Sequence, residues 1–315
     1  MAEYCRGFKT IPIPKKIQSK KINAEQHLLF SDNHVGSFIT EQETGFFGSY
    51  TFDEFSNRCD KLIDKLHHFK ETHMSIYNVN KLVIHMLGDI VEGEGINYKS
   101  QVWHINPSVL HQIFSGGKKI IDIIRAFAGI YPEVEIFCVW GNHGRLDPDR
   151  SYKEETSNWD NVIYMYMRDI LNLIQPNVKM FISESRFMIV RHGDYHFFLA
   201  HGDEITRWMG LPYYGLDRMA ANTSRMVNLL INYIQIGHHH REAQIEIPYG
   251  DEMINGTMAG PNTLGINRYN MALRPSQTTY FFHHKEGIFD KTRVYLAEPV
   301  YLKEDKNRIL TPHFS

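Results

Sequence analysis

Residues 27–34 decide the fold, and they read HLLFSDNH. The apolar run LLF is typical of a buried strand, and the polar SDNH that follows it marks the end of that strand. The same pattern returns twice, because residues 82–89 read LVIHMLGD and residues 134–143 read VEIFCVWGNH. Each apolar strand is therefore expected to end in a short polar cluster that contains Asp, Asn or His.

Amphipathic segments separate these three strands. Apolar side chains recur at three- and four-residue spacing over residues 53–73, which predicts a helix, and a second helix is expected over about 107–127. A strand–helix–strand–helix–strand order predicts a parallel sheet with right-handed crossovers. Ligands of such sheets bind outside the carboxyl ends of the strands, which is where the polar clusters fall.

The second half of the chain has shorter elements. Helices are expected over 158–174 and about 215–232, and a hairpin turn is expected at residues 192–194. Strands are expected near 187–190, 195–200, 233–236, 244–247, 251–254, 278–283 and 292–296.

The chain shows no repeat and no break in composition, so residues 27–300 are predicted to form a single domain with two sheets. The polar, basic segment 1–26 is expected to be a solvated tail or an edge strand, and a phosphate-contacting arm is the alternative. Residues 301–315 are assigned to a C-terminal tail.

The composition is that of a globular protein. The chain has 315 residues, 43% of them hydrophobic, and its 34 Lys and Arg against 36 Asp and Glu give a net charge of −2. That balance argues against a purely electrostatic nucleic-acid binder but leaves room for a local basic groove. The three cysteines form no CxxC pair, which favours a reducing cytoplasm. No signal-like apolar region or membrane-spanning run is seen, so no membrane association is expected.

The polar clusters offer only oxygen and imidazole nitrogen as metal ligands. Carboxylate, amide and imidazole without thiolate suit Mn²⁺, Fe or Zn²⁺. Seven such side chains are too many for one tetrahedral ion and about right for two ions that share a bridging carboxylate. The clusters are Asp32-x-His34, Gly88-Asp89, Gly141-Asn142-His143, His201-Gly202 and Gly237-His238-x-His240.

This order of motifs, over roughly residues 28–247, resembles the calcineurin-like metallophosphoesterases. The segments 212–215, 255–257 and 275–277 look like those of phage- or prophage-encoded members described as SbcD-like exonucleases. The resemblance implies an α/β fold, a four-layer α/β/β/α sandwich with two mixed sheets. It also implies that residues 27–300 form one domain of that family.

The resemblance further implies a role for each matching residue. His143 would be the general acid for the leaving group, Glu92 would orient it, and Asp89 would bridge the two metals. Members of the family commonly have Asp or Glu directly after Gly-Asn-His, whereas this chain has Gly144 and then Arg145, so the surroundings of His143 depart from the family's pattern. The first metal would be bound by Asp32, His34 and His240, and the second by Asn142, His201 and His238.

Substrate contacts are less specific in the sequence. Arg145 could contact phosphates or belong to a solvated charge run, and Tyr98 and Trp103 could stack on bases, pack in the core or form a dimer contact. His192 and His196 flank the expected turn and are given no catalytic role. The paired histidines His67, His68, His283 and His284 are taken as surface or structural residues.

Together these features predict a metal-dependent hydrolase that cleaves phosphodiesters with two divalent ions, Mn²⁺ foremost and Fe, Zn or Ni as alternatives. The expected substrate is DNA, as for a nuclease or exonuclease in phage or bacterial DNA metabolism in the host cytoplasm. A small nucleotide, a cyclic nucleotide or a phosphoprotein is the alternative substrate, and a non-catalytic binding protein is the alternative class. The chain could form a homodimer or be a subunit of a nuclease complex, and the sequence does not choose between these assemblies.

Overall fold

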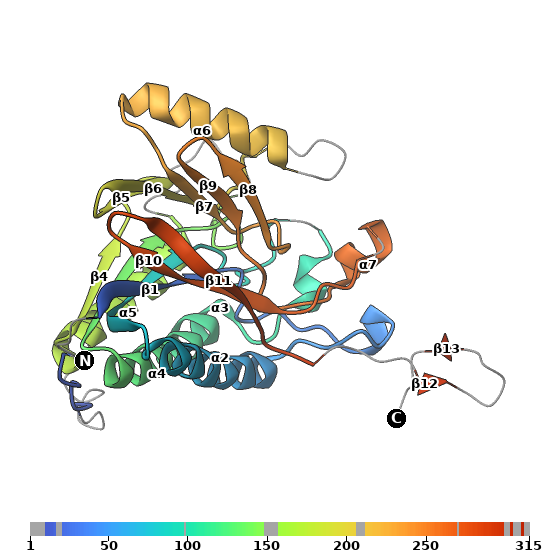
Figure 1. The fold of residues 1–315 in the computed structure, drawn as a ribbon. Helices are drawn as coiled ribbons and strands as arrows, with labels where there is room; N and C mark the ends of the chain where they lie inside the picture. The colour runs from blue at the N-terminus through green and yellow to red at the C-terminus, as the bar shows by residue number, and fades with distance from the viewer. Residues whose placement is uncertain are drawn as a thin grey trace.

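The computed structural model describes residues 10–16, 21–97, 99–147, 157–205, 212–269, 271–298, 303–304 and 310–311. Two sheets pack face to face in this part of the chain, and helices cover their outer faces (Figure 1). The result is a four-layer α/β/β/α sandwich, which confirms the fold that the resemblance implies.

The first sheet carries the three strands that the sequence places first. Its order is β11-β10-β1-β2-β3-β4, in which β1 to β4 are mutually parallel and β10 runs antiparallel to both β1 and β11. The sheet is therefore mixed, with β1 near its centre. The strands are β1 (Ile22–Phe30), β2 (Tyr77–Leu87), β3 (Glu133–Val139), β4 (Val178–Ile182), β10 (Ser276–His283) and β11 (Gly287–Tyr295).

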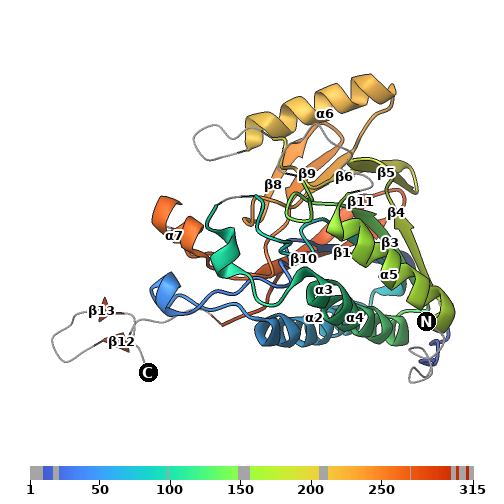
Figure 2. The same ribbon diagram turned by 180° about the vertical axis from the view of Figure 1, so that it is seen from behind.

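Three helices, α2 (Phe52–His73), α4 (Gly117–Ile130) and α5 (Trp159–Ile174), cover the outer face of this sheet (Figure 2). Helix α2 begins at Thr51, whose side chain accepts the backbone N–H of Glu54 and so caps the helix. The apolar faces of these helices join the sheet in one continuous core of buried side chains. This core fixes the carboxyl ends of β1, β2 and β3 side by side.

The second sheet has the order β5-β6-β7-β9-β8, and α6 (Tyr213–Val227) lies on its outer face. Side chains such as Phe197 and Phe282 fill the space between the two sheets. The hairpin predicted at residues 192–194 joins β5 to β6. The strands are β5 (Phe187–His192), β6 (Tyr195–Ala200), β7 (Tyr233–Ile236), β8 (Ala243–Ile247) and β9 (Gly250–Ile254).

The N-terminal segment differs from the prediction. Residues 22–26 belong to a central strand and not to a tail or an edge strand. Their polar side chains are paired inside the protein, since Gln26 donates to Thr279 Oγ1 and accepts from the Tyr131 hydroxyl. Residues 1–9 and 17–20 lie outside the described residues, as does most of the segment 301–315, of which β12 (Lys303–Glu304) and β13 (Leu310–Thr311) are described.

The helix expected over 107–127 is divided into α3 (Val109–His111), a π-helical turn η3 (Gln112–Gly116) and α4. At this turn the Gln112 side chain accepts the Gly93 N–H and donates to the Gly93 carbonyl, so it ties the helix to the loop after β2. Strand β4 and the helix α7 (Thr263–Tyr269) were not predicted. Two short 3₁₀ turns, η1 (Gln42–Thr44) and η2 (Gln101–His104), complete the described elements, and no described helix meets the length and hydropathy of a membrane span.

Candidate metal centre

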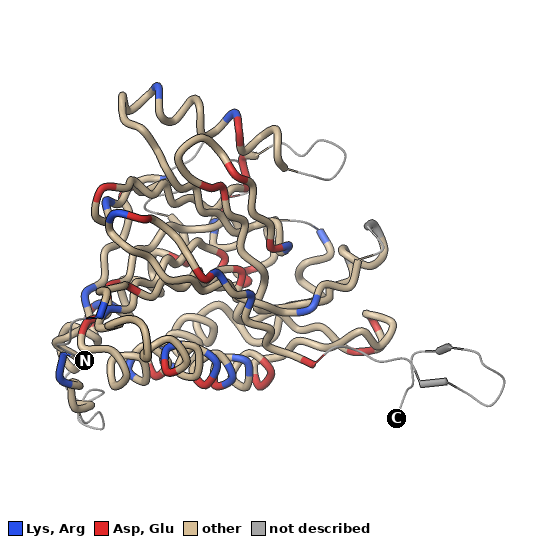
Figure 3. Tube along the Cα trace, in the orientation of Figure 1, with Lys and Arg blue, Asp and Glu red and all other residues tan. Residues whose placement is uncertain are grey.

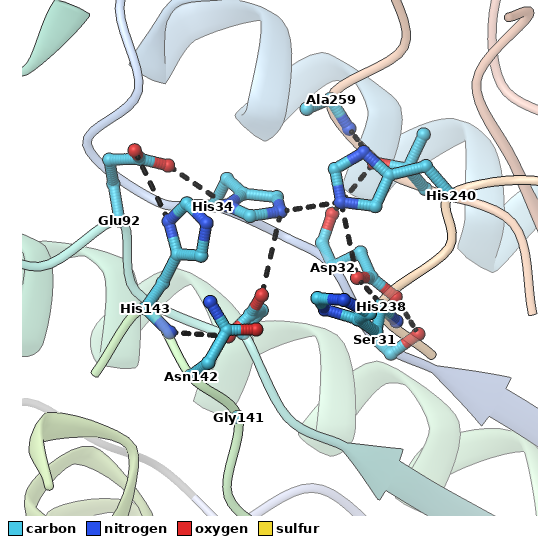
Figure 4. Close-up of polar contacts among 12 residues, drawn as sticks. Ser31, Asp32, His34, Glu92, Gly141, Asn142, His143, His238, His240 and Ala259 are labelled. Carbon is cyan, nitrogen blue, oxygen red and sulfur yellow. Dashed lines mark hydrogen bonds and ion pairs between the residues drawn. The ribbon is translucent and has the colours of Figure 1, made fainter. Parts of the chain in front are cut away.

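The polar clusters of the sequence meet at one edge of the sandwich (Figure 4). Asp32, Asp89 and Asn142 follow β1, β2 and β3 of the first sheet. His201 follows β6 of the second sheet, and His238 and His240 follow β7. Both sheets thus present the carboxyl ends of parallel strands to the same place, which is where the sequence predicts a ligand.

The first group of donors is Asp32, His34 and His240. One donor atom of each lies within 4.8 Å of the others. His34 Nε2 is 3.0 Å from His240 Nε2, which in turn is 3.3 Å from Asp32 Oδ1. His34 Nδ1 donates a hydrogen bond to the Glu92 carboxylate at 2.9 Å. The lone pair of His34 Nε2 is therefore directed at the other donors of the group.

The second group is Asp89, His201 and His238, whose donor atoms also lie within 4.8 Å of one another. His201 Nε2 is 3.0 Å from Asp89 Oδ2 and 3.1 Å from Asn142 Oδ1. His201 Nδ1 donates to the Leu87 carbonyl at 2.7 Å, which turns Nε2 toward the group. Asp89 Oδ2 is also 4.0 Å from His34 Nε2, so Asp89 lies between the two groups.

The charged side chains of the two groups strongly shift the pKa values of Asp89 and His201. Burial alone would raise the pKa of the Asp89 carboxyl, but the nearby imidazoles of His201 and His143 outweigh burial and hold that pKa well below its usual range. Burial alone would lower the pKa of His201, but Asp89 raises it to about 10. Asp89 is therefore an anion, and a metal ion at His201 Nε2 would have to replace a proton.

Backbone strain is concentrated at these same residues. Positive φ angles between 46° and 64° occur at five of the seven donors, although such angles disfavour side chains with a Cβ. Each such residue costs on the order of 1–3 kcal/mol and persists at sites where the surrounding structure holds it. A buried set of carboxylate, amide and imidazole donors on strained backbone fits a pair of divalent cations. The strained donors are Asp32, His34, Asp89, His238 and His240.

Glycine is required where the donor loops touch. A Cβ on Gly141 would lie 2.1 Å from Asp89 Oδ1, and one on Gly237 would lie 2.5 Å from Asp32 Oδ2. Both contacts are too short for any side chain. The motifs Gly237-His238-x-His240 and Gly141-Asn142-His143 therefore use glycine to let the backbone approach a carboxylate.

His143 lies beside the first group, with its ring centroid 4.5 Å from that of His34. Its Nδ1 is 3.3 Å from Glu92 Oε1. Gln101 donates both amide hydrogens to Glu92, to the backbone carbonyl at 3.0 Å and to Oε1 at 2.7 Å. Burial alone would lower the pKa of His143, but the charges of Glu92 and Asp89 raise it to about 9, so its ring is protonated at neutral pH.

Asp160 is a buried residue of the site that the sequence analysis missed. Its Oδ1 accepts the N–H groups of Ile90 and Val91, and its Oδ2 accepts that of Gly141 at 2.8 Å. It thus joins the loops that carry Asp89 and Asn142. The available signal was local, since Asn158 and Asp160 precede an apolar helical pattern as capping residues do.

The predicted substrate contacts have different environments. Arg145 is buried, and its Nη2 lies 2.5 Å from Asp203 Oδ2, so its charge is neutralised by an ion pair. Trp103 is 81% exposed on η2. Tyr98 lies outside the described residues. Arg145 therefore has a structural partner, which the sequence analysis did not foresee.

A cavity of about 90 Å³ opens beside the first group. His34, His143 and His240 line it together with Glu92 and His104. A larger cavity of about 850 Å³ lies at the opposite part of the second sheet, and its lining contains none of the donors. The chemistry of the site therefore faces the small cavity.

No protein-family model and no curated protein matches the sequence. Similar solved structures include Vps29 from Entamoeba histolytica in complex with zinc, with 13% identity, a TM-score of 0.35 and coverage of 86% of this chain and 99% of that one. An archaeal phosphodiesterase has 11% identity, a TM-score of 0.36 and coverage of 85% and 99%. A predicted phosphoesterase from Streptococcus pneumoniae TIGR4 has 10% identity, a TM-score of 0.33 and coverage of 86% and 99%. Likenesses this distant decide neither family nor activity, so the functional assignment depends on the residues of the site.

Proposed function

We propose that this chain is a metal-dependent phosphodiesterase of the calcineurin-like type that binds two divalent cations. One observation carries the proposal, namely that Asp89 lies between two groups of buried oxygen and nitrogen donors. A carboxylate in that position can serve two ions at once. Asp32, His34 and His240 would hold one ion, Asn142, His201 and His238 would hold the other, and Asp89 would bind both.

Such a pair of ions, Mn²⁺ foremost, supplies Lewis-acid stabilisation of a phosphoryl group and makes water nucleophilic toward phosphorus. The chain itself supplies the proton for the leaving oxygen. Protonated His143 faces the cavity, while its Nδ1 is held by Glu92 and its Nε2 is directed away from that carboxylate. Glu92 acts as a positioning residue for both His143 and His34, because each of its oxygens lies beside one of them.

The proposed substrate is DNA, with a single strand favoured over a duplex. The turn η2 supports this, because His104 lines the cavity while the exposed Trp103 stands next to it in sequence and can stack on a base. Figure 3 shows Lys and Arg interspersed with Asp and Glu along α2, which does not favour an extended phosphate-binding face there.

A small phosphodiester such as a cyclic nucleotide is the second candidate substrate. The ion pair between Arg145 and Asp203 favours it, since the positive charge expected to contact a phosphate backbone is already neutralised. The two candidates share one reaction and differ in what lies beyond the scissile phosphate.

The test is hydrolysis by Mn²⁺-loaded protein of bis-p-nitrophenyl phosphate, single- and double-stranded DNA, and cyclic nucleotides. We expect cleavage of the simple diester and of single-stranded DNA. Trp103→Ala is expected to raise KM for DNA several-fold without changing KM for the simple diester. Tyr249→Ala, which removes another exposed aromatic side chain far from the site, is the matched control. Cleavage of cyclic nucleotides with no attack on DNA would select the second candidate, and no cleavage of any diester would refute the proposal.

A further inference from the structure

Three histidines lie together between the two sheets, away from the metal centre described above. His27 and His85 project from β1 and β2 of the first sheet, and His192 projects from the end of β5 in the second. Their exposed fractions are 0%, 0% and 5%. One ring nitrogen of each lies within 4.8 Å of the others. Asp32 lies five positions after His27, which is roughly 16 Å along an extended chain.

Two of these rings have a nitrogen with no hydrogen-bond partner among the described residues, His85 Nε2 and His192 Nε2. The tautomer of His85 is set by its other ring nitrogen, because Nδ1 carries the proton and donates to Gln235 Oε1 at 2.5 Å. The Gln235 amide is oriented by its own N–H, which donates to the Tyr280 hydroxyl at 2.6 Å. His85 Nε2 is thus a buried lone pair without a donor, an arrangement that native cores avoid.

His27 completes the group. Its Nδ1 is 3.2 Å from the Tyr280 hydroxyl, and its Nε2 donates to Glu25 Oε2 at 3.4 Å, so a metal ion at Nε2 would replace that proton. Glu25 stands beside the group, with Oε2 3.4 Å from His27 Nε2 and 3.7 Å from His192 Nδ1. The cluster therefore has two unpartnered imidazole nitrogens, a third imidazole beside them and one carboxylate at its edge. A hydrogen bond from the second nitrogen of a ring is what orients a metal-binding histidine.

The surroundings keep these rings neutral. Burial lowers the pKa of His85 to about 3 and that of His192 to about 2, and it also lowers the pKa of His27. The rings of Phe197 and Phe282 lie 5.8 and 5.3 Å from the His27 ring. Neutral imidazole is the form that binds metal ions, whereas a purely apolar core gains nothing from unpaired nitrogen atoms.

We propose that His27, His85 and His192 bind a structural Zn²⁺ ion that links the two sheets. Three imidazole donors suit zinc, and Glu25 supplies the nearest negative charge to offset that of the ion. Because the ligands come from both sheets, the ion holds the sandwich together and takes no part in the chemistry at its edge. This site is independent of the proposed phosphodiesterase activity.

The test measures zinc in protein purified from zinc-containing medium and then loaded with Mn²⁺ at the other centre. We expect about one tightly held zinc per chain in the wild type, because such an ion is acquired during folding. The variants His85→Gln and His192→Gln are expected to lose it and to keep their bound Mn²⁺. His68→Gln, which alters an exposed histidine on α2, is the matched control. Zinc content equal to the wild type in both cluster variants would overturn the proposal.

If either variant does not fold, measurements on the wild type alone still test the zinc site. X-ray absorption at the zinc edge of the Mn²⁺-loaded protein should show imidazole nitrogen ligands at about 2.0–2.1 Å and no sulfur. Removal of the zinc by a strong chelator should lower the melting temperature of the wild type. A wild type without zinc, or one whose melting temperature does not change when zinc is removed, would refute the site whatever the phosphodiesterase assays give.

Discussion

The side chain of Asp160, at the start of α5, accepts the backbone N–H of Gly141 at 2.8 Å. Its other oxygen accepts the N–H groups of Ile90 and Val91. One carboxylate therefore fixes the loop after β2 relative to the loop after β3. Since these loops carry Asp89 and Asn142, the spacing of two expected metal ligands depends on a residue that touches no metal.

Asp160→Ala should leave three buried N–H groups without an acceptor. At about 1–3 kcal/mol for each unsatisfied group, we expect a loss of 3 kcal/mol or more in the free energy of unfolding. Metal affinity should fall as well, because the two loops lose their common anchor. Denaturant titration and metal titration measure the two effects. Asp160→Asn keeps one acceptor oxygen and should be less affected, and equal behaviour of both variants would contradict the anchoring role.

Asp89→Asn should abolish cleavage of bis-p-nitrophenyl phosphate. The substitution removes the negative charge between the two groups of donors, so at least one ion should be lost from the protein. Metal analysis beside the assay distinguishes this from misfolding. Asp194→Asn at the turn between β5 and β6 is a suitable control and should retain full activity. Wild-type turnover in Asp89→Asn would refute the assignment of the bridging ligand.

His143→Ala should keep its metal and lose turnover by a factor of about 10²–10⁴ on DNA, whose leaving oxygen needs a proton. The loss should be much smaller on bis-p-nitrophenyl phosphate, because p-nitrophenolate is a good leaving group without protonation. A comparison of kcat for the two substrates in the variant and the wild type therefore tests whether His143 protonates the leaving group. Loss of bound metal in this variant, or equal losses on both substrates, would argue against a general acid.

Metal binding should release protons at neutral pH. Asp89 raises the pKa of His201 to about 10, so this imidazole is protonated until a metal ion displaces the proton. The apparent metal affinity should therefore increase as the pH rises from 6 to 8. Calorimetric titration with Mn²⁺ in two buffers of different ionisation enthalpy gives the number of protons released. An affinity that is constant over this range would contradict the prediction.

Stability should depend on pH through Glu252 on β9. Neither of its buried carboxylate oxygens has a hydrogen-bond partner among the described residues, and burial, with Asp217 nearby, raises its pKa from 4.5 to about 7. Because the folded chain holds this proton more tightly than the unfolded chain, the contribution of Glu252 to the free energy of unfolding falls as the pH rises from about 4.5 to about 7.

Glu252→Gln, which cannot ionise, should therefore be more stable than the wild type at pH 8 and gain little at pH 5. Denaturant midpoints at the two pH values check this. Glu246→Gln on the exposed side of β8 is the matched control and should show no such difference. A stabilisation by Glu252→Gln that is equal at both pH values would show that its charge is not responsible.

Much of the fold is predictable because its strands are strongly apolar. Periodicity locates α2 to within one residue at its start, and the polar clusters after β1, β2 and β3 fall at the predicted edge. Strand β4, with the sequence VKMFI, has only five residues and follows α5 after a short connection, so no clear pattern marks it. The first half of β1 is missed because its polar residues are satisfied by partners far along the chain, such as Thr279.

The candidate site is predictable as a set of residue types but not as a geometry. The motifs identify the donors, yet nothing local in the sequence shows that His34 or His240 has a positive φ. The pairing of Arg145 with Asp203 joins residues 58 positions apart, and no spacing rule indicates it. The cluster of His27, His85 and His192 was missed for the same reason, since each residue alone is an ordinary strand or turn histidine.

The pairing of β1 with β10 has a consequence for how the chain is made. Strand β1 is synthesised about 250 residues before its partner β10, because it completes its hydrogen bonding with residues 278–282. During translation one side of β1 therefore stays unpaired until β10 has left the ribosome. A chain released before β10 should therefore be prone to aggregation, because the first sheet cannot be completed.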